Sequence, residues 1–207
     1  MLFRSQDDPP PSTRYVLCVG RLMDPRKNIG MLLEAFAQVA AACSGPVELV
    51  LAGSGGPNPP FWSRVSALGL TDRVRFVKAP TQEELVRLYQ HCAVFALSSE
   101  EEGLGVVLLE AMACGIAVVA TRCGGPDGVI THGSDGFLVQ RSNVEEMARC
   151  IQRLLADEPL RQAMGQRARQ TIEARYADDV AAAAFVAMWD RLLDKVSGTG
   201  SHTPTGH

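Results

Sequence analysis

Short runs of apolar, largely β-branched residues alternate along the chain with longer stretches whose apolar positions recur at helical intervals. The short runs have the length and composition of buried strands, and they lie at 15–19, 47–52, 74–77, 93–97, 116–120 and 137–139. The longer stretches predict helices at 29–43, 61–70, 81–92 and 104–115. This alternation predicts an α/β fold, in which a parallel β-sheet of about six strands is flanked by helices and joined by right-handed crossovers.

The pattern changes after the last strand. Helical patterns follow at roughly 144–156, 158–175 and 177–195, and the third carries a broad apolar stripe. The stripe consists of Phe185, Met188, Trp189, Leu192 and Leu193. Residues 1–13 are polar and proline-rich, which is typical of a linker, and 197–207 have the composition of a disordered tail. We therefore expect a single Rossmann-like domain over 14–196.

Local signals support these boundaries. Thr81 with Glu84 three residues later predicts a capping box, and Asn143 with Glu146 resembles another. Gly115 follows a helical pattern and suits the position just after a helix end, where the backbone takes a positive φ.

Composition excludes several classes of protein. The chain has 207 residues, of which 46% are apolar, so it is long and apolar enough to form a core. Its net charge of −3 gives no basic surface for DNA or RNA, and we expect no nucleic-acid partner. Glu110 interrupts the longest apolar run, which argues against a membrane span but leaves peripheral membrane contact open. No apolar signal segment follows Arg4, so we expect a cytoplasmic protein.

The cysteines and histidines do not suggest a metal site. The six cysteines form no C-x-x-C pair and sit among apolar residues, which favours free thiols that pack as small hydrophobic side chains. The four histidines show no ligand spacing. We therefore expect neither a bound metal nor another cofactor.

Candidate chemistry lies in the loops that follow strands, because ligands of open parallel sheets bind beyond the carboxyl ends of the strands. After the first strand, Arg21, Arg26 and Lys27 precede a helix N-terminus, which favours an anion such as phosphate. The alternative, solvated surface charges near Asp24, carries roughly equal weight from this loop alone.

The glycines after the second strand, at 53–56, superficially resemble a dinucleotide-binding loop. Their spacing is wrong and they follow the second strand instead of the first, so a flexible turn is favoured. An NAD-dependent oxidoreductase would rest on this turn and on the fold pattern alone.

The loop after the fourth strand gives the strongest signal. Gly103 and Gly105 would let a ligand approach the backbone at the start of a helix. Glu102 and Glu110 are eight positions apart, which would put both on one helix face, and Glu110 in an apolar helix would need a partner such as a ribose diol. The alternative is an exposed acidic run at 100–102, with Glu110 satisfied by a nearby arginine or the backbone.

Four segments together resemble the C-terminal, donor-binding half of retaining GT-B-fold glycosyltransferases of the group 1, or family 4, type. They are VLCVGRLMDPRKNIGMLLEAF, LVLAGSGG, EEGLGVVLLEAMACGIAVVAT and GGPDGVITHGSDGFLV, and the resemblance runs from about Tyr15 to Leu193. The third segment contains the E-x7-E pattern of this family, with Glu102 and Glu110 as its two glutamates.

The resemblance implies a role for each matching residue. Arg21 and Lys27 would hold the donor pyrophosphate beside Gly20, and they would act in catalysis together with Glu102, which would bind hydroxyls of the donor sugar. Glu110 would bind the nucleotide ribose.

Backbone groups complete the implied donor site. The N–H groups around Gly103, Leu104 and Gly105 would contact sugar or phosphate, and the base would lie near Val77 and Lys78.

The implied activity is transfer of a sugar from a nucleoside-diphosphate sugar, such as a UDP-sugar or GDP-sugar, to an acceptor, with retention of configuration and without a metal. An N-terminal domain or separate subunit would bind the acceptor. Relatives often carry a glutamate where this chain has Gly128, so either Asp127 would substitute for it or that contact would be missing. The alternative is a binding module for a nucleotide or nucleotide sugar that catalyses nothing.

Overall fold

The computed structural model describes residues 13–176, and residues 13–170 belong to one compact unit. Residues from Thr171 onward belong to a second unit, of which only 171–176 are described. The strands are β1 (Arg14–Val19), β2 (Val47–Gly53), β3 (Val74–Lys78), β4 (Val94–Leu97), β5 (Val118–Thr121) and β6 (Phe137–Val139). The α-helices are α1 (Ile29–Ala42), α2 (Pro59–Ala67), α3 (Gln82–His91), α4 (Val106–Ala113), α5 (Gly125–Val129), α6 (Val144–Ala156) and α7 (Glu158–Arg175).

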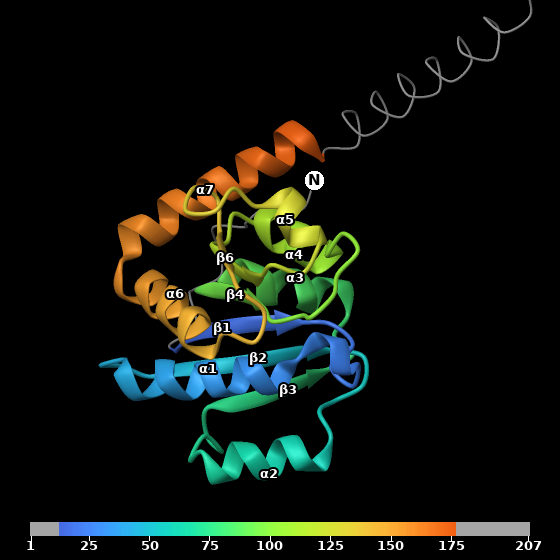
Figure 1. The fold of residues 1–207 in the computed structure, drawn as a ribbon, viewed down its shortest axis with the longest axis vertical. Coiled ribbons are helices and arrows are strands. Elements are labelled where there is room, and N and C mark those ends of the chain that lie inside the picture. Colours follow the sequence, from blue (N-terminus) through green and yellow to red (C-terminus); the bar gives the residue numbers. More distant parts are fainter. Residues whose placement is uncertain (1–12, 177–207) are drawn as a thin grey trace, which may run out of the picture. The chain divides into compact units, whose positions relative to one another are not determined.

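All six strands are parallel and form one sheet in the order β3-β2-β1-β4-β5-β6. The predicted α/β fold is therefore confirmed (Figure 1). The order reverses between β1 and β4, which pair through Val16 with Val94 and through Leu17 with Phe95. Consecutive loops leave the sheet on opposite sides at such a point and open a crevice between them.

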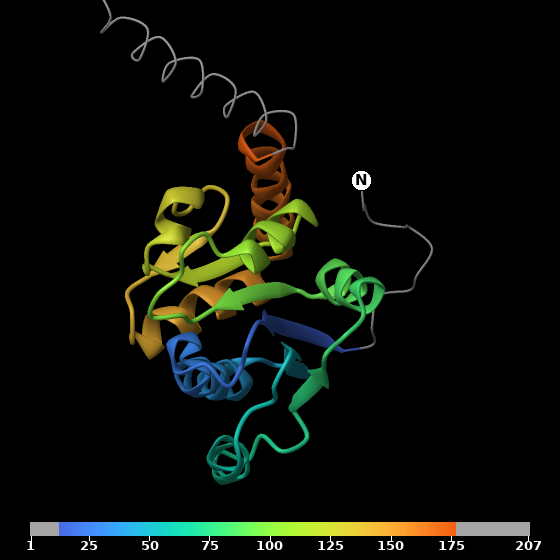
Figure 2. The same cartoon turned by 90° about the vertical axis from the view of Figure 1, so that its right-hand side faces the viewer.

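Helices cover both faces of the sheet, as the fully buried strands predicted. On one face, Val16 and Cys18 of β1 belong to the same buried cluster as Phe36 of α1 and Ile151 of α6. On the other face, Tyr89 of α3 contacts the ring of Phe95, with ring centroids 5.8 Å apart. Figure 2 shows α1 and α3 on opposite sides of the strands.

The capping predictions are confirmed with one difference. Thr81 and Glu84 form a complete capping box, and Gly115 follows α4 with a φ of 73°. Asn143 caps α6 by accepting from the Glu146 N–H, but the Glu146 carboxylate accepts from Gln140 N instead of the cap residue. The short helix α5 and a 3₁₀ turn at Pro25–Lys27 (η1) were not predicted, because too few residues carry their pattern.

Three of the segments predicted from the sequence lie mostly or wholly outside the described residues. These are the linker at 1–13, of which only Thr13 is described, the tail at 197–207, and the helix expected at 177–195 with its apolar stripe. All six cysteines are described, and each is a free thiol that is buried or half-buried, as expected.

Candidate functional site

A small hollow lies where the sheet order reverses, between the loop after β1 and the loop after β4. Its volume is about 170 Å³. It is lined by Arg21, Asp24, Arg26, Lys27, Glu101, Glu102 and Gly103. The hollow therefore joins two of the three loops that the sequence singled out, and it holds the three residues expected to act in catalysis, Arg21, Lys27 and Glu102.

Lys27 and Glu102 form an ion pair across this hollow, between Nζ and Oε1. Their side chains are only 15% and 12% exposed, so water screens the pair less than it would at the surface. The Ser99 hydroxyl, which is buried, donates to the same carboxylate oxygen at 2.9 Å. The two side chains thus meet where a ligand anion would have to enter.

The other two cations of the hollow face Asp24. Arg26 donates to both oxygens of its carboxylate, from Nε at 3.1 Å and from Nη2 at 2.7 Å, and Arg21 lies 3.6 Å away with its side chain 71% exposed. Hydrogen bonds from Arg26 lower the pKa of Asp24 from 3.8 to about 2. Arg21 is therefore the cation of the hollow that is most open to an incoming anion.

The loop after β1 is held in place from both sides. Gly20 N donates to Ala52 O at 3.0 Å, and the buried Ser98 hydroxyl donates to Lys27 O at 2.8 Å. Gly53 has a φ of 146°, and a Cβ there would lie only 1.9 Å from Gly20 O. The turn after β2 thus begins with a close backbone contact under the loop after β1, which only glycine can make.

The loop after β4 is fixed by the turn after β5. Glu102 N donates to Cys123 O at 3.1 Å, and Gly125 N donates to Glu102 O at 2.8 Å. A Cβ on Gly125 would lie 2.6 Å from Gly103 O, so only glycine fits at this approach. Sequence reasoning missed this support, although the Gly124-Gly125 pair after a strand was a visible signal.

Glu102 and Glu110 do not share a helix face, which corrects the expectation drawn from their spacing. Gly105 takes a φ of 73° and caps α4, which begins at Val106, so Glu102 lies before the helix. Gly103 and the exposed Leu104 connect Glu102 to the helix cap at Gly105. At the start of α4, Leu108 N and Leu109 N donate to Gly105 O, at 2.7 and 3.2 Å, so the N–H groups left for a ligand are those of Val106 and Val107.

Glu110 is exposed, so the burial cost argued for it from sequence does not arise. The Tyr89 hydroxyl of α3 donates to Glu110 Oε2 at 2.7 Å, which is a different partner from the arginine or backbone group considered above. Burial, and to a lesser extent the Glu110 carboxylate, raise the pKa of Tyr89, which therefore stays a neutral donor. Tyr89 holds the carboxylate in one orientation.

Val77 and Lys78 lie at the carboxyl end of β3, where they pair with Ala52 and Gly53 at the carboxyl end of β2. The next residue, Ala79, has a φ of 45° and donates from its N–H to Gly53 O at 2.8 Å. The residues expected near the base are thus tied to the glycine turn that supports the loop after β1.

Asp127 and Gly128 lie in α5. The Asp127 carboxylate accepts from Gly124 N at 3.0 Å and from Arg122 at 3.3 Å. Its oxygens therefore cap the helix and pair with Arg122 in this structure.

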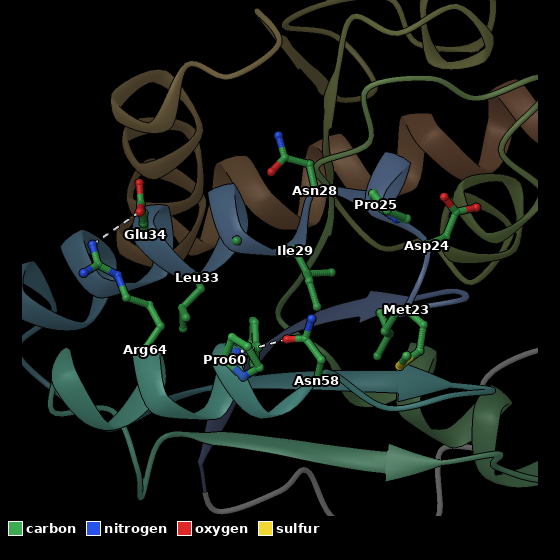
Figure 3. Close-up of a pocket in the computed structure, with 13 residues that line it drawn as sticks. Met23, Asp24, Pro25, Asn28, Ile29, Leu33, Glu34, Asn58, Pro60 and Arg64 are labelled. Atoms are coloured by element: carbon green, nitrogen blue, oxygen red, sulfur yellow. Dashed lines mark hydrogen bonds and ion pairs between the residues drawn. The ribbon is translucent and has the colours of Figure 1, made fainter.

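A larger hollow of about 400 Å³ lies on the other side of the β1 loop, between that loop and α2 (Figure 3). Its walls are mainly apolar, and an ion pair between Glu34 and Arg64, at 3.4 Å, spans its far end (Figure 3). It contains none of the residues that the sequence assigned to a ligand. Volume alone therefore does not identify the functional site.

Across residues 13–176 there is no cluster of three or more His, Cys, Asp or Glu side chains suited to a metal ion. Within the same range, none of the helices combines the length and apolar character required to cross a bilayer.

The fold defines an α/β protein of the Rossmann-like class, with a hollow lined by charged side chains at its topological switch point. The model of the family of glycosyl transferases group 1 matches residues 3–171, and the chain belongs to this family.

Known relatives agree with this assignment. The chain is 32% identical to N-acetyl-alpha-D-glucosaminyl L-malate synthase of Bacillus anthracis, over 83% of this chain and 44% of that protein. Among solved structures, sucrose-phosphate synthase from Thermosynechococcus elongatus has a TM-score of 0.77 at 30% identity, covering 90% of this chain and 47% of that one. HepE of Anabaena in complex with UDP-glucose has a TM-score of 0.73 at 25% identity, covering 90% and 49%. The chain spans about half the length of these relatives.

Proposed function

We propose that this chain is the donor-binding half of a retaining glycosyltransferase, which transfers a sugar from a nucleoside-diphosphate sugar to an acceptor. The observation that carries the proposal is the Lys27–Glu102 pair in a hollow at the switch point of the sheet. The neighbour HepE, solved with UDP-glucose, supports a nucleotide-sugar donor. Such a ligand carries the anion that the cations of the hollow would bind and the hydroxyls that its carboxylate would bind.

The cations act on the leaving group. Breaking the bond between sugar and phosphate develops negative charge on the nucleoside diphosphate, and fixed cations stabilise this charge without needing to reorganise. Arg21 is exposed and open to the phosphates, whereas Lys27 must first exchange Glu102 for a phosphate oxygen. In this proposal Arg21 and Lys27 perform the role that a divalent metal has in other transferases.

The exchange also frees the Glu102 carboxylate to accept hydrogen bonds from hydroxyls of the donor sugar. Glu110, oriented by Tyr89, would accept from the ribose. Neither glutamate acts as the acid or nucleophile of a glycosidase, in which two carboxyl groups flank one bond. Both are positioning groups for the donor.

A second half of the enzyme would bind the acceptor. Supporting this, the chain spans only about half of its relatives, and exposed apolar residues flank the hollow. They are Met23 on the loop after β1, Leu104 just before α4 and Val106 at its first position. An apolar rim of this kind suits a cleft that closes against another domain.

Nucleotide binding tests the donor site directly. We would measure the melting temperature of the 207-residue chain with UDP, GDP and ADP and with their sugars, since a ligand of the folded state raises it. At least one should give a clear shift, and Lys27→Ala should abolish that shift. Arg64→Ala is the matched control, because Arg64 pairs with Glu34 at 3.4 Å outside the donor hollow, and the shift should persist.

Transfer is then tested by adding an acceptor-binding half taken from a relative. Product that keeps the anomeric configuration of the donor sugar, formed in the presence of EDTA, would support both the retaining chemistry and its independence of a metal. If nucleotides bind but the paired halves never transfer sugar, a binding module becomes the better description. If no nucleotide shifts the melting temperature, the donor site is wrongly assigned.

A further inference from the structure

Glu100 belongs to the acidic run before the donor hollow, but its contacts set it apart from the neighbouring glutamates. Its carboxylate accepts from the Asn28 side-chain amide and, at 3.1 Å, from the Ser142 hydroxyl. Its own N–H donates to Arg26 O at 2.7 Å, and its carbonyl accepts from Arg141 at 3.4 Å. One residue therefore joins the loops that follow β1, β4 and β6.

Two of these partners have an unusual backbone. Within residues 13–176, the non-glycine residues with a positive φ are Asn28, Ala79 and Ser142, and Glu100 binds the side chains of Asn28 (φ 43°) and Ser142 (φ 58°). L-residues avoid this region unless surrounding contacts hold them there. Glu100 supplies such a contact to both.

Asn28 transmits the position of Glu100 to the loop after β1, which carries Lys27. It directly follows Lys27, and its Oδ1 accepts from Met31 N at 3.3 Å, which caps α1. The amide can make this cap and reach Glu100 together only in one orientation. On its other side, Glu100 is two residues from Glu102 along the chain. Glu100 therefore fixes both members of the Lys27–Glu102 pair relative to each other.

We infer that Glu100 is a positioning residue for donor binding, whose carboxylate holds the Lys27 loop and the Glu102 loop in register for the nucleoside diphosphate. The inference rests on the proposed function. Glu100 does not line the donor hollow, so it acts through Asn28 and Ser142.

Electrostatics and positioning predict opposite results for the loss of this side chain. If Glu100 acted only through its charge, removing an anion near the phosphate site would make a nucleoside diphosphate bind more tightly. If it positions the two loops, its removal weakens binding. The sign of the change therefore separates the two roles.

The test is calorimetric titration of the wild-type chain and its variants with UDP, GDP and ADP. Glu100→Ala should weaken binding roughly tenfold, as expected for loss of hydrogen bonds to a charged group. Glu100→Gln keeps an acceptor oxygen at the same reach and should restore affinity to within about threefold of wild type. Glu83→Ala, which removes an exposed carboxylate from the first turn of α3, should bind as wild type does. Unchanged or tighter binding by Glu100→Ala would overturn the inference.

A double-mutant cycle tests the route through Asn28. If Glu100 acts through this residue, Asn28→Ala combined with Glu100→Ala should lose little more affinity than Asn28→Ala alone. Fully additive losses would contradict the route.

Hydrogen exchange separates failure of this inference from failure of the proposed function, because it needs no ligand. In Glu100→Ala, amides of 26–31 and 140–144 should exchange faster, while those of β1 and β2 should not change. Unchanged exchange in both loops would overturn the positioning role even if nucleotides bind. A wild-type chain that binds none of the three nucleotides would instead contradict the proposed function.

Discussion

Cations lie at both ends of the sheet, but their partners differ. At the carboxyl end, Lys27 faces the carboxylate of Glu102, inside a hollow of about 170 Å³. At the amino end, a hollow of about 330 Å³ contains Arg14 and Arg161. These arginines donate to backbone carbonyls of the last turn of α6, Arg14 to Leu155 O at 2.8 Å and Arg161 to Leu154 O at 3.0 Å. Arg161 also lies 3.6 Å from the carboxylate of the exposed Glu158.

The difference shows which cations are able to bind a ligand. A carbonyl at a helix C-terminus has no partner within its own helix, so an arginine bound to it is committed to the fold. A carboxylate can be exchanged for another anion at a small cost, because the cation keeps a charged acceptor throughout. Thus the smaller hollow, with the exchangeable pair, is the candidate ligand site, and the larger one at the amino end is structural.

The largest effect is expected at the amino end of the sheet, on the free energy of unfolding. Arg14→Ala removes a donor from a helix-terminal carbonyl, and we expect the free energy of unfolding to fall by about 1–2 kcal/mol. Nucleotide affinity should not change. Urea unfolding followed by circular dichroism measures the loss, with Arg64→Ala, whose ion pair is exposed, as a control that should change it by less than about 0.5 kcal/mol. A weaker nucleotide affinity in Arg14→Ala would contradict the division between the two ends.

At the carboxyl end we expect a smaller change, a gain in nucleotide affinity in place of a loss of stability. Glu102→Gln removes the anion that competes for Lys27, so UDP or GDP should bind more tightly, by about fivefold, corresponding to about 1 kcal/mol. The corresponding nucleotide sugar should gain less, because Glu102 would no longer bind its hydroxyls as a carboxylate. Calorimetric titration of the wild type and of Glu102→Gln with both ligands measures the change in affinity for each. If the nucleoside diphosphate binds no more tightly to the glutamine variant, Glu102 does not compete for Lys27.

The sequence predicted the sheet well because parallel strands are buried on both faces and appear as continuous apolar runs. The run at 93–97, for example, corresponds to Val94–Leu97, and the run at 137–139 to β6. It also singled out the loops after β1 and β4, which the structure brings together at the reversal in strand order. Both inferences depend on local composition and on chain order alone.

Geometry inside the loops was harder to predict. The spacing of Glu102 and Glu110 suggests one helix face only if the helix includes both, and the positive φ of Gly105 delays its start to Val106. The role of Glu100 depends on Ser142, 42 residues further along the chain, in a loop after β6 where the sequence indicated only the helix cap at Asn143. Such contacts follow from tertiary packing, which a pattern in one segment does not report.

The smallest effect is expected for Asp24, whose pairing with Arg26 should make stability depend on pH. The folded pKa of about 2 lies below the ordinary value of 3.8, so ionisation of this carboxyl favours the folded state. Its contribution is therefore complete above about pH 4 and is lost as the pH falls toward 2. Asp24→Asn keeps the shape and should melt slightly below wild type at pH 6, and the difference should shrink between pH 4 and 2. A difference in melting temperature that stays constant from pH 6 to pH 2 would show that the ion pair does not cause it. The loss of stability in Arg14→Ala should, by contrast, not depend on pH. Neither the guanidinium nor the Leu155 carbonyl titrates between pH 6 and pH 2, so the hydrogen bond between them should contribute equally over this range.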